Sequence, residues 1–90
     1  MNDLSPPGRR GPKLVVLSRE YCHLCDDLLA GLRQLQGRYD FQIEVVDVDS
    51  RPELEERWGD KVPVVLDGEI EVCRYHLDPE AVGARLARMK

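Results

Sequence analysis

The sequence predicts an α/β fold with the element order βαβαββα, in which four strands form one mixed sheet flanked by three helices. Three observations predict this fold. An apolar run of strand type at 13–18 precedes leucines at helical spacing, as at the beginning of a βαβ unit. The dipeptide Asp67-Gly68, between two strand-type runs, is a strong signal for a two-residue hairpin turn. The pair Asp78-Pro79 then marks the beginning of a last helix.

The composition indicates one small soluble domain. Hydrophobic residues make up 42% of the 90 residues and charged residues 33%, as in globular proteins. The net charge of -4 argues against a nucleic-acid partner, which needs a basic face. The apolar runs are too short to cross a bilayer, and no apolar segment of a secretory signal is present. We therefore expect a cytoplasmic protein with neither nucleic-acid nor membrane partners. We also expect a monomer.

The N-terminal residues differ in composition from the rest of the chain. Residues 1–12 contain three prolines and two glycines with little apolar content. We expect them to form a flexible tail, and we expect residues 13–90 to form the folded domain.

The first half of the domain reads as strand, helix and strand. The run at 13–18 is expected to be buried on both faces. A helix is expected from Cys22, ended by Gly37, because leucines recur there with a helical period. Apolar residues alternate again over 41–48, which predicts a second strand. The helix between the two strands predicts that they are parallel, with a right-handed crossover.

The second half reads as a short helix, a hairpin and a last helix. Ser50 and Glu53 have the spacing of a capping box, which predicts a helix that runs to about Trp58. Strands are expected at 62–66 and 69–75, antiparallel to each other. Three apolar residues supply the inner face of the last helix, namely Val82, Leu86 and Met89.

The motif Cys22-His23-Leu24-Cys25 lies where the first strand leads into the first helix. The free N–H groups and the dipole of a helix N-terminus stabilise an anion, and the thiolate is the reactive form of cysteine. The two-residue spacer lets both sulfurs meet within one helical turn. Cys22, at the exposed end, would attack a substrate disulfide, and the more buried Cys25 would resolve the mixed disulfide. The alternative for both cysteines is a packing role as small core residues.

Charged neighbours act on this motif in opposite directions. Arg19 lies three residues before Cys22 and would help to hold a thiolate there, and a protonated His23 would do the same. Asp26 and Asp27 oppose this effect, although acidic residues suit a helix N-terminus. The residue types therefore leave the net effect on Cys22 open.

The dipeptide Val62-Pro63 opens the third expected strand. Proline cannot donate to a sheet, so its presence there marks an edge or a special turn. On base rates alone this peptide bond is expected to be trans.

Together these features resemble the glutaredoxin and thioredoxin families, and in particular small bacterial glutaredoxin-like proteins that begin near the first strand. The segment Ser-Arg-Glu-Tyr-Cys22-His-Leu-Cys25 stands where these families have their active site. From Lys13 onward the order of elements matches. The resemblance implies a thioredoxin-like fold, thiol–disulfide oxidoreductase activity through Cys22 and Cys25, and a cis bond at Val62-Pro63 beside them.

The resemblance also implies substrate contacts. The backbone of Val62 would pair with an extended substrate chain or glutathione, and Pro63 would pack against the sulfurs. Arg19 matches a basic residue that contacts the glutathione carboxylate. The expected partners are protein disulfides or small-molecule thiols, with no bound cofactor. Glutathione is one possible reductant.

The chain departs from the family pattern at two points. His23 follows the first cysteine, where the families usually have proline or glycine. Glutaredoxins bind glutathione with a Gly-Gly-x-Asp stretch after the hairpin. Here that region reads Cys73-Arg-Tyr-His-Leu-Asp-Pro79, without the glycines.

Two other functions compete with this interpretation. Cys22, Cys25, Cys73 and His76 have the spacing C-x2-C and C-x2-H, which suits tetrahedral zinc. Their weakness as a site is that Cys73 and His76 would point to opposite faces of a strand, because their separation is odd. A redox-inert interaction domain on the same scaffold is the other alternative, since a fold alone does not establish activity.

Two features of the sequence are expected to be structural. Asp47 and Asp49 lie two residues apart, and they are expected to face solvent at a strand end, with a cation site as the alternative. Trp58 is expected to pack in the core or against the sheet edge.

Overall fold

The computed structural model describes residues 11–88 of the chain. The predictions for residues 1–10 and for Met89 lie outside the described residues. Gly11 and Pro12, at the end of the expected tail, are bound to the second strand. The backbone N–H of Gln42 donates to the carbonyl of Pro12 over 2.8 Å, and its side-chain amide donates to the carbonyl of Gly11 over 3.3 Å.

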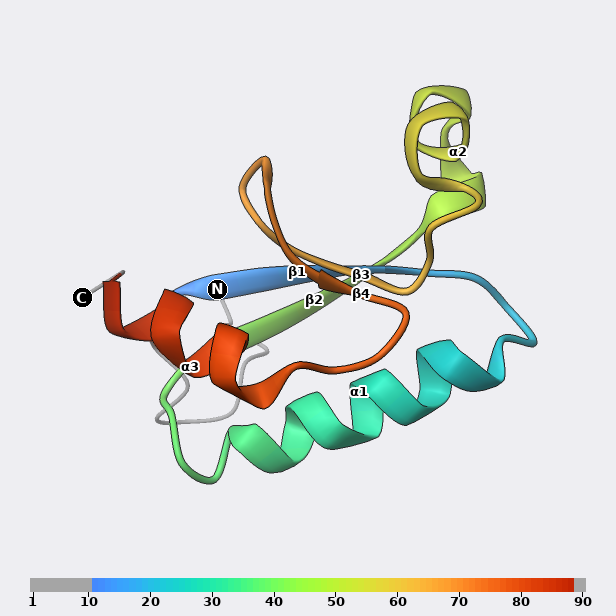
Figure 1. Cartoon of the computed structure of the whole chain (residues 1–90). Helices are drawn as coiled ribbons and strands as arrows, with labels where there is room; N and C mark the ends of the chain where they lie inside the picture. The colour runs from blue at the N-terminus through green and yellow to red at the C-terminus, as the bar shows by residue number, and fades with distance from the viewer. Residues whose placement is uncertain (1–10, 89–90) are drawn as a thin grey trace, which may run out of the picture.

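The described residues form a four-stranded mixed sheet with helices on both faces (Figure 1). The elements follow the order β1 (Lys13–Ser18), α1 (His23–Leu35), β2 (Gln42–Asp47), the 3₁₀ helix η1 (Val48–Ser50), α2 (Pro52–Trp58), β3 (Val64–Asp67), β4 (Ile70–Arg74) and α3 (Pro79–Arg88). The strand order is β2-β1-β3-β4, in which β1 is parallel to β2 and antiparallel to β3, and β3 is antiparallel to β4. The predicted fold is thereby confirmed.

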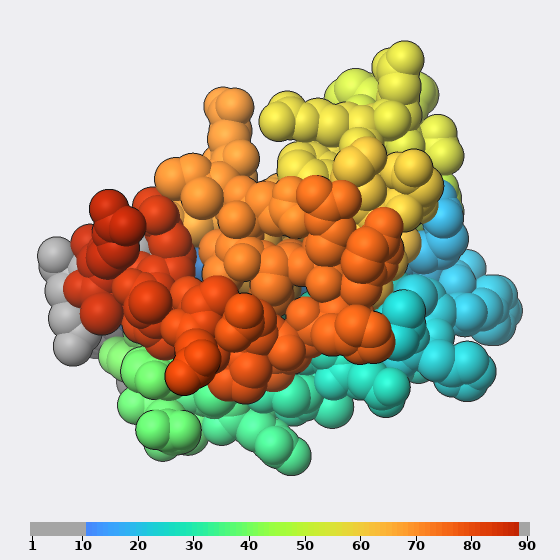
Figure 2. Space-filling model, viewed as in Figure 1, coloured from blue at the N-terminus to red at the C-terminus, as the bar shows by residue number. Residues whose placement is uncertain are grey.

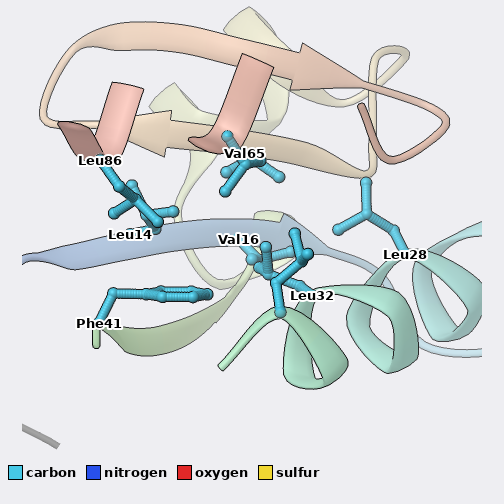
Figure 3. Packing of buried hydrophobic residues seen from close by; sticks show 9 residues of the cluster. Leu14, Val16, Leu28, Leu32, Phe41, Val65 and Leu86 are labelled. Atoms are coloured by element: carbon cyan, nitrogen blue, oxygen red, sulfur yellow. The ribbon is translucent and has the colours of Figure 1, made fainter. Parts of the chain in front are cut away.

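The central strand β1 is buried on both faces, as its uninterrupted apolar run predicts. Leu14 and Val16 pack against α1 and α3, and Figure 3 shows them with residues of both helices. Burying one such side chain contributes about 1.5–3 kcal/mol. This larger cluster contains the buried residues Leu14, Val16, Leu28, Leu32, Leu35, Phe41, Val65, Val82 and Leu86.

The opposite face of the sheet carries a smaller core beneath η1 and α2. Leu17 of β1 and Val64 of β3 pack there against Val48 and Trp58. Trp58 is therefore a core residue, as expected. This cluster fixes the end of α2, from which the chain continues to Pro63 and β3.

The predicted beginning of α2 differs from the structure, whereas the predicted end of α1 agrees with it. The capping box at Ser50 is wrong, because α2 has Arg51 as its N-cap with no side-chain cap hydrogen bond. The hydroxyl of Ser50 donates instead to the carbonyl of Asp47, over 2.7 Å. Helix α1 ends at Leu35 with its C-cap at Gln36, so Gly37 directly follows the helix as predicted, although it lacks the left-handed backbone typical of a terminating glycine.

The hairpin and the last helix begin nearly where expected. Gly68 has a φ of 62°, which suits the tight turn between β3 and β4. Strand β3 begins at Val64, two residues later than predicted, because Pro63 has no N–H to donate to the sheet. Asp78 caps α3, since its carboxylate accepts a hydrogen bond from the backbone N–H of Ala81 over 3.1 Å.

Candidate active site

Cys22 and Cys25 lie at the N-terminus of α1, which follows the central strand β1. Cys22 is the N-cap residue, with an extended backbone (φ -114°, ψ 109°). Its sulfur accepts a hydrogen bond from the backbone N–H of Cys25 over 3.2 Å. Both cysteines are free thiols, Cys22 partly exposed and Cys25 only 2% exposed. The structure therefore places the pair at the helix N-terminus, with Cys22 partly exposed and Cys25 buried.

A residue with a left-handed backbone conformation directs the chain into α1. Tyr21 has a φ of 58°, a conformation that a bulky residue rarely adopts. Its side chain is fully exposed and contributes no packing that would offset the cost. Such backbone geometry is concentrated at functional sites, where the surrounding structure holds it in place. The turn at Tyr21 thus gives Cys22 the extended backbone that an N-cap requires.

The environment of Cys25 favours its protonated form. Burial raises the pKa of the Cys25 thiol to about 11, and the hydrogen bond and charge of Cys22 act in the same direction. The backbone of Arg19 opposes this rise. Cys25 therefore keeps its proton at neutral pH, while Cys22 accepts the backbone N–H. The two sulfurs differ in environment as well as in exposure.

The side chain of Arg19 lies between two other segments of the chain. Its Nε and Nη2 donate to the two carboxylate oxygens of Asp49, over 2.9 Å and 3.0 Å. Its Nη1 donates to the carbonyl of Gly59 over 3.0 Å. Sequence reasoning placed Asp49 at a strand end facing solvent and missed this partner. Parallel pairing could have found it, because Ser18 at the end of β1 lies opposite Asp47 at the end of β2.

Pro63 is buried at the beginning of β3, and the Val62–Pro63 peptide bond is cis. Its carbonyl accepts a hydrogen bond from the backbone N–H of Tyr75 over 2.7 Å. The hydroxyl of Tyr75 donates to the carbonyl of Asp60 over 3.0 Å. Val62 is half-buried against the smaller core. The segment before β3 is therefore held by the loop that follows β4.

That loop also reaches α1. A Cβ atom added at Gly31 of α1 would lie only 2.7 Å from the Cδ2 atom of Leu77, so the two segments are in close contact. Figure 2 shows the orange segment after β4 against the teal first turns of α1. Three exposed large hydrophobic residues lie just before α1, in its first turn and just after β4, namely Tyr21, Leu24 and Tyr75.

Of the remaining candidate residues, His23 lies between the two cysteines, whereas Cys73 and His76 lie elsewhere, on and after β4. His23 is exposed at the first position of α1. Cys73 is half-buried on β4, where burial raises its pKa, and His76 is exposed in the following loop. Between residues 11 and 88, no group of three or more His, Cys, Asp or Glu side chains could hold a metal ion. The zinc alternative, all of whose residues are described, is therefore not assembled.

None of the helices between residues 11 and 88 has the length and apolar content that a transmembrane helix needs.

The family model of the glutaredoxin-like domain (DUF836) matches residues 13–87, which include both cysteines, Arg19 and Pro63. The chain belongs to this glutaredoxin-like family. The match covers all four strands and most of α3, so the family assignment and the observed topology agree.

Solved structures resemble this glutaredoxin-like domain over nearly its whole length. Protein Ne2328 from Nitrosomonas europaea is 38% identical, with 94% of this chain and 98% of that chain covered and a TM-score of 0.76. The structural genomics target XcR50 from X. campestris is 28% identical, with 86% and 99% covered and a TM-score of 0.68. Thioredoxin 1 from Thermosipho africanus TCF52B is 24% identical, with 84% and 96% covered and a TM-score of 0.57. This last likeness concerns the fold alone, which is thioredoxin-like.

Proposed function

We propose that this glutaredoxin-like domain is a thiol–disulfide oxidoreductase that uses Cys22 and Cys25 as its dithiol. The observation that supports it most strongly is the 3.2 Å hydrogen bond from the Cys25 backbone to the Cys22 sulfur. A backbone N–H at a helix N-terminus stabilises negative charge on its acceptor, and the thiolate is the attacking species in disulfide exchange. Cys22 is also the sulfur of the pair that a substrate can reach.

The first step of the proposed cycle takes place on Cys22. Its thiolate attacks one sulfur of a substrate disulfide, so the substrate S–S bond breaks and a mixed disulfide forms. The second substrate sulfur leaves as a thiolate and takes a proton from solvent. Exposed His23 follows Cys22 directly and is proposed to modulate the reactivity of the pair.

The second step takes place on Cys25. Its thiol gives up its proton to solvent and attacks the Cys22 sulfur, which closes a Cys22–Cys25 disulfide and releases the remaining substrate thiolate, which takes a proton from solvent. The substrate has then gained two electrons and the dithiol has lost two. Two equivalents of an external thiol, of which glutathione is one candidate, return the pair to its reduced form. This cycle needs no bound cofactor, and it fits a reducing cytoplasm.

Protein disulfides and small-molecule thiols are the proposed partners of a monomeric domain. The backbone of Val62, directly before buried Pro63, is proposed to pair with an extended substrate chain. Val62 lies in the segment held by Tyr75, so its backbone has a fixed place beside β3.

Reductase assays test this function. Wild-type protein with excess dithiothreitol as the reductant should accelerate the reduction of both insulin and glutathione disulfide. Cys22→Ser should abolish turnover, since it removes the attacking sulfur. Cys73→Ser is the matched control, because Cys73 is a half-buried thiol on β4 outside the pair. Failure of the wild-type protein with both substrates would instead support a redox-inert interaction domain.

A further inference from the structure

Three segments that are distant in the chain are joined by one side chain. Arg19 belongs to the connection between β1 and α1 and lies three residues before Cys22. Its guanidinium binds both carboxylate oxygens of Asp49 in η1 and the carbonyl of Gly59 at the end of α2. From Gly59, the C-cap of α2, the chain continues directly to Pro63 and β3. The segments that carry Cys22 and Pro63 are thereby linked through a single arginine.

We propose that Arg19 is a positioning residue, which holds the Cys22 segment against the segment that leads to Pro63. This inference rests on the function proposed above, and it assigns Arg19 a role other than binding a substrate carboxylate. The role follows from the bonds that the guanidinium already makes. A bidentate contact to a carboxylate fixes both the distance and the orientation of the two groups.

The charge around Arg19 favours the same role. The Nη2 atom lies 3.9 Å from the Oε2 atom of Glu55, in addition to its bond with Asp49. A substrate carboxylate would have to displace Asp49 and would then meet the negative charges of Asp49 and Glu55. The hydrogen bond to Arg19 also lowers the pKa of Asp49, so this carboxylate stays ionised and bound at neutral pH.

The segment that Arg19 holds is also fixed from the opposite side. The hydroxyl of Tyr75 binds the carbonyl of Asp60, and the backbone N–H of Tyr75 binds the carbonyl of Pro63. Gly59 itself is buried, and a Cβ atom there would lie 2.5 Å from the carbonyl oxygen of Glu55. The stretch between Gly59 and Pro63 has little freedom to adjust. Loss of the Arg19 side chain should therefore loosen mainly the segment that carries Cys22.

Two disulfides that differ in charge separate positioning from substrate binding. Glutathione disulfide carries carboxylates, whereas 2-hydroxyethyl disulfide carries none. For Arg19→Ala we expect kcat to fall about tenfold with both disulfides, while KM stays unchanged. Asp49→Asn should lower kcat in the same way. The kcat of the double variant should be no lower than that of the more impaired single variant, because the two substitutions remove the same contact. Arg19→Lys should restore only part of the activity, since lysine cannot make the bidentate bond.

Arg85→Ala is the matched control. Arg85 of α3 makes an ion pair of its own with Asp67 at the far end of β3, through Nε and Oδ2 atoms 2.5 Å apart. We expect this variant to keep the wild-type kcat with both disulfides. A KM increase that is confined to glutathione disulfide in Arg19→Ala would overturn positioning in favour of carboxylate binding. Unchanged kcat in Arg19→Ala would overturn it as well.

A readout without turnover separates this inference from the proposed function. If the wild-type protein reduces neither disulfide, the proposed function fails, and hydrogen exchange of the Cys25 amide still tests positioning. That amide donates to the Cys22 sulfur. Arg19→Ala should accelerate its exchange about tenfold relative to Arg85→Ala, because the Cys22 segment is no longer held. Equal exchange in the two variants would overturn the positioning role.

Discussion

The backbone N–H of Cys25 lies 3.2 Å from the sulfur of Cys22, so the first cysteine caps the helix whose first turn contains the second. One contact thus has two consequences. It satisfies a backbone donor that a helix N-terminus leaves without an intrahelical partner, and it gives the exposed sulfur a donor that stabilises negative charge. Helix stability and thiol chemistry are coupled at this position.

Substitutions at Cys22 should separate the cap from the chemistry. A serine hydroxyl accepts the same backbone hydrogen bond, whereas alanine cannot. We expect Cys22→Ala to be less stable than Cys22→Ser by about 1 kcal/mol, because only alanine leaves the Cys25 N–H without a side-chain acceptor. Urea unfolding under reducing conditions measures the difference. Equal stability of the two variants would contradict the capping role.

The buried thiol of Cys25 should make the stability of the reduced protein depend on alkaline pH. Its pKa is raised from the ordinary value of 9.0 to about 11, so the unfolded chain loses this proton at a lower pH than the folded chain does. The stabilising effect is complete below pH 9.0 and is lost as the pH rises through about 11. The free energy of unfolding should therefore fall over this interval.

The matched comparison for this pH dependence is Cys25→Ala. Other groups titrate in the same interval in both proteins, so the difference between their free energies of unfolding isolates the thiol. Between about pH 8 and about pH 10.5, the free energy of unfolding measured with urea should fall further in the wild-type protein than in Cys25→Ala. Parallel losses would mean that the Cys25 thiol has the same pKa in the folded and unfolded chains.

Asp49 provides an independent test of its bond with Arg19. The hydrogen bond from Arg19 lowers the pKa of Asp49 below its ordinary value of 3.8. The stabilisation from this bond is complete above that value and is lost as the pH falls through the lowered pKa. An NMR titration of the carboxyl group should show the pKa of Asp49 rising toward 3.8 in Arg19→Ala. An unchanged midpoint would contradict the bidentate contact in solution.

Metal removal should leave the fold unaffected. Cys73 on β4 and His76 beyond it do not join the cysteine pair in a metal-binding group of residues 11–88. We expect purified protein to show the same thermal unfolding midpoint before and after treatment with EDTA. Stoichiometric zinc in the native protein, with loss of the fold on chelation, would contradict this expectation and restore the zinc alternative.

Features that depend on local sequence could be predicted. The helical spacing after Cys22, the turn at Asp67-Gly68 and the cap at Asp78 each involve residues a few positions apart, and the structure confirms them. The capping box at Ser50 failed for a local reason too. The Ser50 hydroxyl bonds back to Asp47 within the preceding 3₁₀ turn, a competing contact that spacing alone does not reveal.

Contacts between distant segments were mostly missed. Arg19 and Asp49 are 30 positions apart, and their bond depends on β1 and β2 ending at the same edge of the sheet. The sequence predicts the parallel pair, but it does not show which side chains meet beyond the strand ends. Tyr75 contacts Asp60 and Pro63 while its own backbone is left-handed, with a φ of 67°. A tyrosine side chain gives no reason to expect this backbone conformation.

Trapping of the reaction intermediate tests the role of the cysteine pair. Cys25→Ser protein, treated with insulin or a mixed-disulfide peptide, should accumulate a covalent adduct because the resolving thiol is absent. Peptide mass spectrometry should place the adduct on Cys22, and added dithiothreitol should release it. Substrate bound through Cys73, or no adduct from a protein whose Cys22 is reduced, would contradict attack by the sulfur at the helix N-terminus.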